Sequence, residues 1–237
     1  MLTDRRLLTH VDSSACNSNW TVQQTIAWVG FMKSASRTVI WMGAAFGGAL
    51  AIAIAVMLIE GAGISGTTMG LRLTARFSYA FFWLAYVGGA VAILFGPNFG
   101  IVARRVREFG LAFASAQLVH IGLVIWIALI SPPQSIKSAV MPFFAIAVVW
   151  TYLLAALSID YAGEVFSSSM LRIIRTIGSE YIALTFFTDF VLVPEYPVHY
   201  PIVYMPFWGM LLVGPLLRLA AAAKALKGRR VAALRTT

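Results

Sequence analysis

The stretch RRVREFGLAFASAQLVHIGLVIWIALI, from Arg104 to Ile130, decides the fold class. Three of its first four residues are arginines, and no charged residue occurs between Phe109 and Ile130. An α-helix needs about 20 apolar residues to cross the roughly 30 Å hydrocarbon core of a bilayer, so this run predicts a membrane span. A single histidine, His120, falls near the midpoint of the run.

Apolar runs of this kind recur along the chain. The chain has 237 residues, of which 60% are hydrophobic and 11% charged, whereas a soluble protein carries about 25% charged residues. Tyr181–Val193 is shorter than the other runs, contains Asp189, and is expected to borrow residues from Leu171–Ser179. We therefore predict an all-α integral membrane protein, a bundle of six transmembrane helices. Besides Phe109–Ile130 and Tyr181–Val193, the six apolar runs include Val39–Ile59, Phe77–Gly96, Ala139–Ile159 and Pro201–Leu217.

The positions of the basic residues predict the orientation. If the N-terminus faces the cytoplasm, fifteen Lys and Arg residues lie on that side and three, Arg72, Arg76 and Lys137, on the other. Cytoplasmic loops carry an excess of Lys and Arg, so both termini are predicted to be cytoplasmic. The net charge of +9 then reflects membrane topology, and we expect no binding of nucleic acid.

Three segments are expected. Residues 1–36 form a cytoplasmic or interfacial segment, residues 37–219 the six-helix domain, and residues 220–237 a basic cytoplasmic tail. Asn19–Lys33 contains two tryptophans and is typical of a helix that lies in the membrane interface. The basic tail suits a surface of anionic lipid, and binding of a partner protein is the alternative.

Motifs of soluble enzymes are missing from the sequence. The only cysteine, Cys16, excludes an internal disulfide and a multi-cysteine metal site. The chain has no glycine-rich nucleotide-binding motif and no HExxH zinc motif. It also has no flavin or nicotinamide domain, so any electrons that it carries must come from a separate donor protein or a quinone.

His120 is the main candidate for a functional residue, because ionisable groups inside a membrane mark functional sites by default. One helical face beside it holds Gln117, Ala116, Phe113 and Ala112, which are small, polar or aromatic. Such a face admits either a flat cofactor or a closely packed helix. Haem iron binds a neutral imidazole, so His120 is a candidate ligand of b-type haem iron. The alternative is a histidine that hydrogen-bonds to another helix.

Asp189 is the second ionisable group within an apolar run. A carboxylate inside a span must be neutral, paired or close to water. A hydrogen bond between Asp189 and His120 would satisfy both groups and could orient a haem-binding imidazole. The alternative is that Asp189 lies close to the outer face, because Pro194 follows soon after it.

Two stretches, RLTARFSYAFFWLAYVGGAVAILFGP and RRVREFGLAFASAQLVHIG, resemble the bacterial ferric-reductase-like transmembrane proteins. In that family an Ala-Arg pair opens one span. An Arg-Arg pair and a Gly-Leu pair open the next, with a histidine ten residues after the glycine. The later LRIIRTIGSEYIAL is similar to the next family signature. The matching positions are Ala75–Arg76, Arg104–Arg105, Gly110–Leu111, His120 and Leu171–Leu184.

The resemblance covers roughly Arg72 to Leu219 and implies a cytochrome b-type six-helix bundle in the bacterial inner membrane. Family members carry b-type haem between histidines of different helices. At the position of the second family histidine this chain has Ile174, which is expected one helix across from His120. Four arrangements stay open. The haem has one histidine ligand, a methionine such as Met205 or Met210 supplies the second, a partner subunit supplies it, or the haem is lost.

The expected function is therefore a ferric-reductase-like redox protein, a transmembrane electron-transfer subunit with at most one b-type haem on His120. The alternative is a haem-free accessory subunit of a membrane complex. Supporting roles are expected for Gln117, Asp189, Arg104 and Arg105.

The predicted orientation has a direct test. A reporter fused after Pro197 should be active in the periplasm, and one fused after Arg107 should be active in the cytoplasm, because basic residues are retained on the cytoplasmic side. Periplasmic activity at Arg107 would contradict the orientation.

Overall fold

The computed structural model describes residues 13–131, 141–158, 167–192 and 201–235. Across these four ranges the chain forms helices and turns and no strand. The elements in chain order are α1 (Ser13–Glu60), α2 (Ile64–Phe95), the 3₁₀ turn η1 (Pro97–Phe99), α3 (Gly100–Arg104), α4 (Val106–Ile130), α5 (Met141–Ala156), α7 (Ser168–Phe187), the π-helical turn η2 (Thr188–Leu192) and α8 (Pro201–Arg235).

Four helical stretches in the described ranges are long and apolar enough to cross a membrane. They are Ser36–Glu60, Ile64–Phe95, Pro97–Ile130 and Met205–Gly228. The protein is therefore an α-helical multi-pass membrane protein. α5 is apolar but has only 16 residues, and α7 has 20 residues and is more polar.

The chain divides into an N-terminal unit, Met1–Ile40, and a second unit, Trp41–Thr237. In the first unit the chain is helical from Ser13 onwards, so the predicted helix Asn19–Lys33 is a part of α1. His10 and His199 lie outside the described residues.

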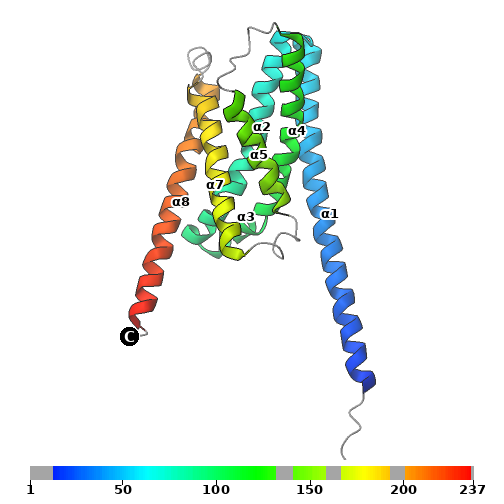
Figure 1. The fold of residues 1–237 in the computed structure, drawn as a ribbon, viewed down its shortest axis with the longest axis vertical. Coiled ribbons are helices and arrows are strands. Elements are labelled where there is room, and N and C mark those ends of the chain that lie inside the picture. Colours follow the sequence, from blue (N-terminus) through cyan, green and yellow to red (C-terminus); the bar gives the residue numbers. More distant parts are fainter. Residues whose placement is uncertain (1–12, 132–140, 159–166, 193–200, 236–237) are drawn as a thin grey trace, which may run out of the picture. The chain divides into compact units, whose positions relative to one another are not determined.

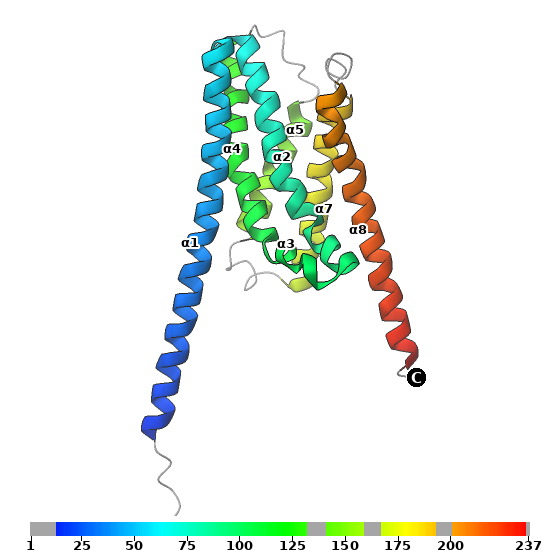
Figure 2. The ribbon, with the colours of Figure 1, turned by 180° about the vertical axis from the view of Figure 1, so that it is seen from behind.

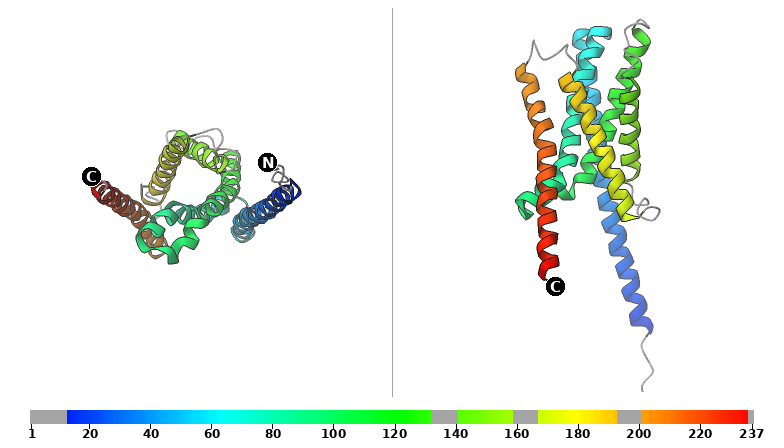
Figure 3. Two further views of the ribbon diagram at one scale, coloured as in Figure 1. Left: turned by 90° about the horizontal axis from the view of Figure 1, so that it is seen from below. Right: turned by 60° about the vertical axis from the view of Figure 1, so that its left-hand side comes forward.

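In the second unit, consecutive long helices run in opposite directions (Figure 1). α2 packs against both α4 and α8, and α5 packs against α7. Figure 2 shows α2 between these two neighbours. In the view along the helix axes in Figure 3, α4, α5 and α7 follow one another around the bundle. α2 thus has the most extensive packing of the helices in this unit, against α4 and α8.

One predicted boundary is wrong. The second span was expected to begin at Phe77 with Arg72 and Arg76 outside it, but α2 begins at Ile64 and contains both arginines. The reason is the tight connection from α1. Gly61 has a φ of 82°, and a Cβ atom at Gly66 would collide with the Gly61 carbonyl oxygen. These glycines allow the chain to reverse at once, so α2 starts much earlier than the apolar run.

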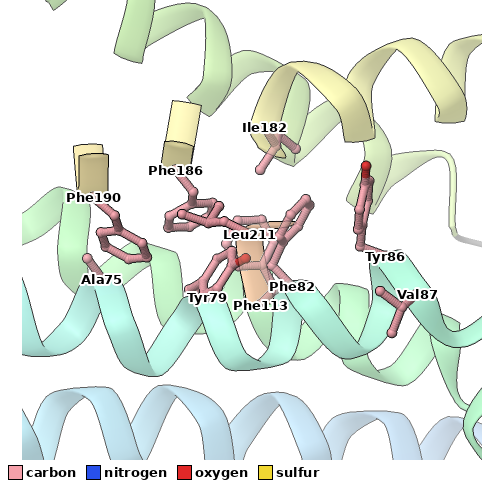
Figure 4. Packing of buried hydrophobic residues seen from close by; sticks show 10 residues of the cluster. All are labelled: Ala75, Tyr79, Phe82, Tyr86, Val87, Phe113, Ile182, Phe186, Phe190 and Leu211. Atoms are coloured by element: carbon pink, nitrogen blue, oxygen red, sulfur yellow. The ribbon is translucent and has the colours of Figure 1, made fainter. Parts of the chain in front are cut away.

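Aromatic rings fill the centre between α2, α4, α7 and α8 (Figure 4). The ring of Phe82 lies 5.3 Å from that of Phe113 and 5.6 Å from that of Phe186, measured between centroids. We call these rings, together with the apolar side chains that pack among them, the aromatic cluster. Tilted and edge-to-face rings at such distances attract each other beyond their apolar contact area. The buried members of the aromatic cluster are Ala75, Tyr79, Phe82, Tyr86, Val87, Phe113, Ile182, Phe186, Phe190 and Leu211.

A second cluster joins α1 to α4 through small side chains. The hydroxyl of Ser115 donates to the Met42 carbonyl across the contact, at 2.9 Å. Small residues let the backbones of membrane helices approach closely. We call this contact the alanine seam, and its alanines, all nearly or fully buried, are Ala45, Ala49 and Ala53 of α1 with Ala112 and Ala116 of α4.

The contact between α5 and α7 depends on Gly178. A Cβ atom there would lie 2.7 Å from Trp150 Cε3. We expect Gly178→Val to lower the free energy of unfolding in detergent by about 1–3 kcal/mol, because overpacking forces neighbours to move. Gly209→Val is the control, since a Cβ atom at Gly209 would have no atom within 4 Å. Equal losses in both variants would contradict the close contact.

Candidate functional site around His120

His120 lies on α4 and faces Thr74 of α2. Its Nδ1 atom is 3.1 Å from the Thr74 hydroxyl oxygen. That hydroxyl is buried and also lies 2.8 Å from the Gly70 carbonyl oxygen of its own helix, to which it donates. Thr74 therefore holds the imidazole through Nδ1.

The face of α4 beside His120 is filled by protein. Ala112 and Ala116 pack in the alanine seam against α1. Phe113 belongs to the aromatic cluster, and its ring lies 6.0 Å from that of Phe186 between centroids. Side chains of α1 thus pack on the two alanines, and side chains of α2 and α7 pack on Phe113.

Gln117 has a buried side-chain oxygen without a hydrogen-bond partner among the described residues. An unsatisfied buried polar atom costs about 1–3 kcal/mol. Gln117 lies one helical turn from His120, so the two polar groups are neighbours on α4.

Arg104 ends α3, and Arg105 separates α3 from α4. At 1.5 Å per residue both lie more than about 20 Å along the chain from His120 and do not support its ring.

Asp189 is not brought to His120. It lies in η2 and interacts electrostatically with Arg76 of α2, whose guanidinium group is 5.9 Å from the ring centroid of Phe207. Residues two positions apart on a helix point about 200° apart, so Arg76 and Thr74 face opposite sides of α2. Asp189 and His120 therefore bind different faces of the same helix, and the hydrogen bond expected between them is not formed.

Ile174 is not across from His120 either. It packs against Leu157 and Leu171 near the start of α7. α7 reaches the α4 residue Phe113 through Phe186, which is twelve residues, or about 18 Å, further along α7. His120 lies beyond Phe113 in the same direction along the bundle, so Ile174 and His120 are at different levels.

Of the two methionines considered as iron ligands, one is exposed and the other packs against the aromatic cluster. Met205 is 67% exposed. Met210 packs on the aromatic cluster, and its carbonyl accepts a hydrogen bond from Trp83 Nε1 at 2.8 Å. The hydrogen-bonding contact that the structure gives His120 is with Thr74 of α2.

A second polar cluster joins three helices and was not predicted. The Tyr86 hydroxyl donates to Glu180 Oε2 at 2.7 Å, and Arg218 Nη2 lies 3.0 Å from Glu180 Oε1. The Arg218 guanidinium group also lies 4.3 Å from the centroid of the Tyr86 ring. The sequence signal was a glutamate inside one helical run and an arginine at the end of another, which is an opposite pair at membrane depth.

Comparison with known proteins identifies no relative, since the chain matches no protein-family model, no curated protein and no solved structure. Function is therefore inferred from the geometry.

The Thr74–His120 hydrogen bond can be measured with a double-mutant cycle. Thr74→Val keeps the side-chain shape but removes the hydroxyl oxygen, and His120→Leu removes the ring nitrogen. We expect a coupling of about 0.6 kcal/mol in the free energy of unfolding, and at most about 1.7 kcal/mol, as for other hydrogen bonds between membrane helices. Thr68→Val is the control, because its hydroxyl donates to Ile64 of its own helix at 2.7 Å. A coupling of the same size with Thr68 would contradict the pairing.

Proposed function

We propose that this chain is a six-span protein of the bacterial inner membrane, with both termini in the cytoplasm, that serves as a haem-free accessory subunit of a membrane complex. α7 with η2 runs over Ser168–Leu192 and is long enough for a span at 1.5 Å per residue. α5 is the shortest span and lies between α4 and α7.

The proposed orientation is supported by where the basic residues gather. Arg107, Arg172, Arg175 and Arg218 come from three helices and line one cavity at one end of the bundle. At that same end, Lys224 donates to the Ile93 and Leu94 carbonyls, at 2.8 and 3.1 Å, near the end of α2. A single basic end is what the positive-inside rule expects of the cytoplasmic side.

The absence of haem is argued from packing. A b-type haem is planar and would need space between α4 and the helix that holds its second ligand. That centre is occupied by the rings of Phe82, Phe113 and Phe186, and the small face of α4 is covered by α1. The residues present do not fit a haem on His120, so we assign no electron-transfer step to this histidine. The ring packing is the observation that carries the proposal.

Membership of a complex is supported by the Glu180–Arg218 pair. The Glu180 side chain is 49% exposed, although it lies within α7 and pairs with Arg218. Charged groups that face hydrocarbon are costly, even when they are paired. A polar group of a neighbouring subunit against this surface would remove that cost.

Electron transfer is the second candidate function, and one observation favours it. Thr74 contacts Nδ1, so Nε2 is the ring nitrogen that a metal would bind, as in many metal-binding histidines whose other ring nitrogen is held by a protein group.

A reduced-minus-oxidised absorption spectrum separates the two functions. We expect protein purified from haem-replete cells to show no Soret band, because α1 and the aromatic cluster pack against the face of α4 beside His120. The native b-type cytochromes of the same membranes are the control for haem supply. A Soret band that His120→Leu abolishes would overturn the haem-free proposal and select the electron-transfer subunit.

A further inference from the structure

We propose that the arginine-lined cavity at the basic end of the bundle binds the phosphate headgroup of an anionic phospholipid. This site is separate from His120 and does not depend on whether the protein binds haem. It lies between α2, α4, α5, α7 and α8 and has a volume of about 750 Å³. That volume is within the usual range of small-molecule sites, about 300–1,000 Å³.

The cavity has a charged part and an apolar part. Four guanidinium groups line it, those of Arg107, Arg172, Arg175 and Arg218, and none of its described lining residues is a carboxylate. The nearby Glu180 pairs with Arg218 at 3.0 Å and so offsets one charge. Arg107 has an interaction of its own, so the charge available to a ligand is mainly that of the exposed Arg172 and Arg175. An anion bound there would be attracted by these two guanidinium groups.

The available hydrogen-bond donors select the kind of anion. The hydroxyls of Ser158, Thr176 and Ser179 line the cavity but donate to carbonyls of their own helices, at 2.7, 2.9 and 3.0 Å. The guanidinium groups are thus the main donors. Arg175 uses one N–H group on the Leu157 carbonyl at 2.8 Å and keeps others. Guanidinium groups bind phosphate with two parallel hydrogen bonds, so several arginines around one cavity favour a phosphate group.

The apolar part of the cavity argues for a lipid over free phosphate. Phe82, Phe113 and Ile182 line it together with leucines, and an inorganic phosphate ion would leave this surface uncovered. The acyl chains of a phospholipid would cover it. Basic pockets between transmembrane helices on the cytoplasmic side are known sites for anionic lipid headgroups.

Two variants change the cavity by different means. Arg172→Gln removes an exposed positive charge from its lining. Gly110→Leu adds a side chain on the α4 wall, where a Cβ atom would have no atom within 4 Å, and so fills space without a change of charge. Arg104→Gln is the matched control, because Arg104 is an exposed arginine at the end of α3 and does not line the cavity.

The experiment is native mass spectrometry of the full chain. The protein is released from nanodiscs made of equal parts phosphatidylcholine and phosphatidylglycerol, and the retained lipid is identified. We expect retained phosphatidylglycerol on the wild type and about fivefold less on Arg172→Gln, which is the equivalent of about 1 kcal/mol per arginine near the membrane surface. Gly110→Leu should also lose the lipid, and Arg104→Gln should keep it.

Other outcomes would overturn the proposal. Equal loss in Arg172→Gln and Arg104→Gln would mean that the lipid is attracted by overall charge and not by the cavity. Retention of phosphatidylcholine in preference to phosphatidylglycerol would exclude an anionic headgroup.

In a parallel melting experiment in detergent, inorganic phosphate should raise the Tm less than phosphatidylglycerol does. An equal rise would assign the cavity to free phosphate.

Discussion

The contact of the Phe82 ring with the rings of Phe113 and Phe186 is the interaction on which the rest of the bundle depends. It brings together α2, α4 and α7 at one level, and Leu211 extends the cluster to α8. Lipid tails are as apolar as these side chains, so the rings associate through close packing and not through release of water. The same packing closes the space beside His120 and leaves the arginine-lined cavity towards the basic end.

α2 also satisfies the ionisable groups of the bundle. Thr74 pairs with His120 on one face, and Arg76 interacts with Asp189 on another. Further along α2, the Tyr86 hydroxyl joins the Glu180–Arg218 pair. Polar groups inside a membrane persist when protein groups pair with them, and here a single central helix supplies those partners.

The sequence predicts the fold class well and the site poorly. Apolar runs matched to the bilayer reveal the helices, because length and hydropathy are local properties. The start of α2 was misplaced, because Arg72 and Arg76 were placed outside the second span before the pairing of Arg76 was known. From its chemistry alone, Asp189 was a better partner for His120 than Thr74. The rotation of α2, however, turns Thr74 towards His120. Likewise, the arginines indicated only orientation, because their convergence on one cavity is a tertiary property.

We propose that packed rings, and not a cofactor, occupy the space between α2, α4 and α7 beside Phe113. The most direct measurement is a nuclear Overhauser experiment on protein with selectively labelled phenylalanines, produced in haem-replete cells. The predicted result is cross-peaks from the Phe113 ring to those of Phe82 and Phe186, whose centroids lie 5.3 and 6.0 Å away. The absence of both cross-peaks, with the large ring-current shifts that a porphyrin produces, would contradict it.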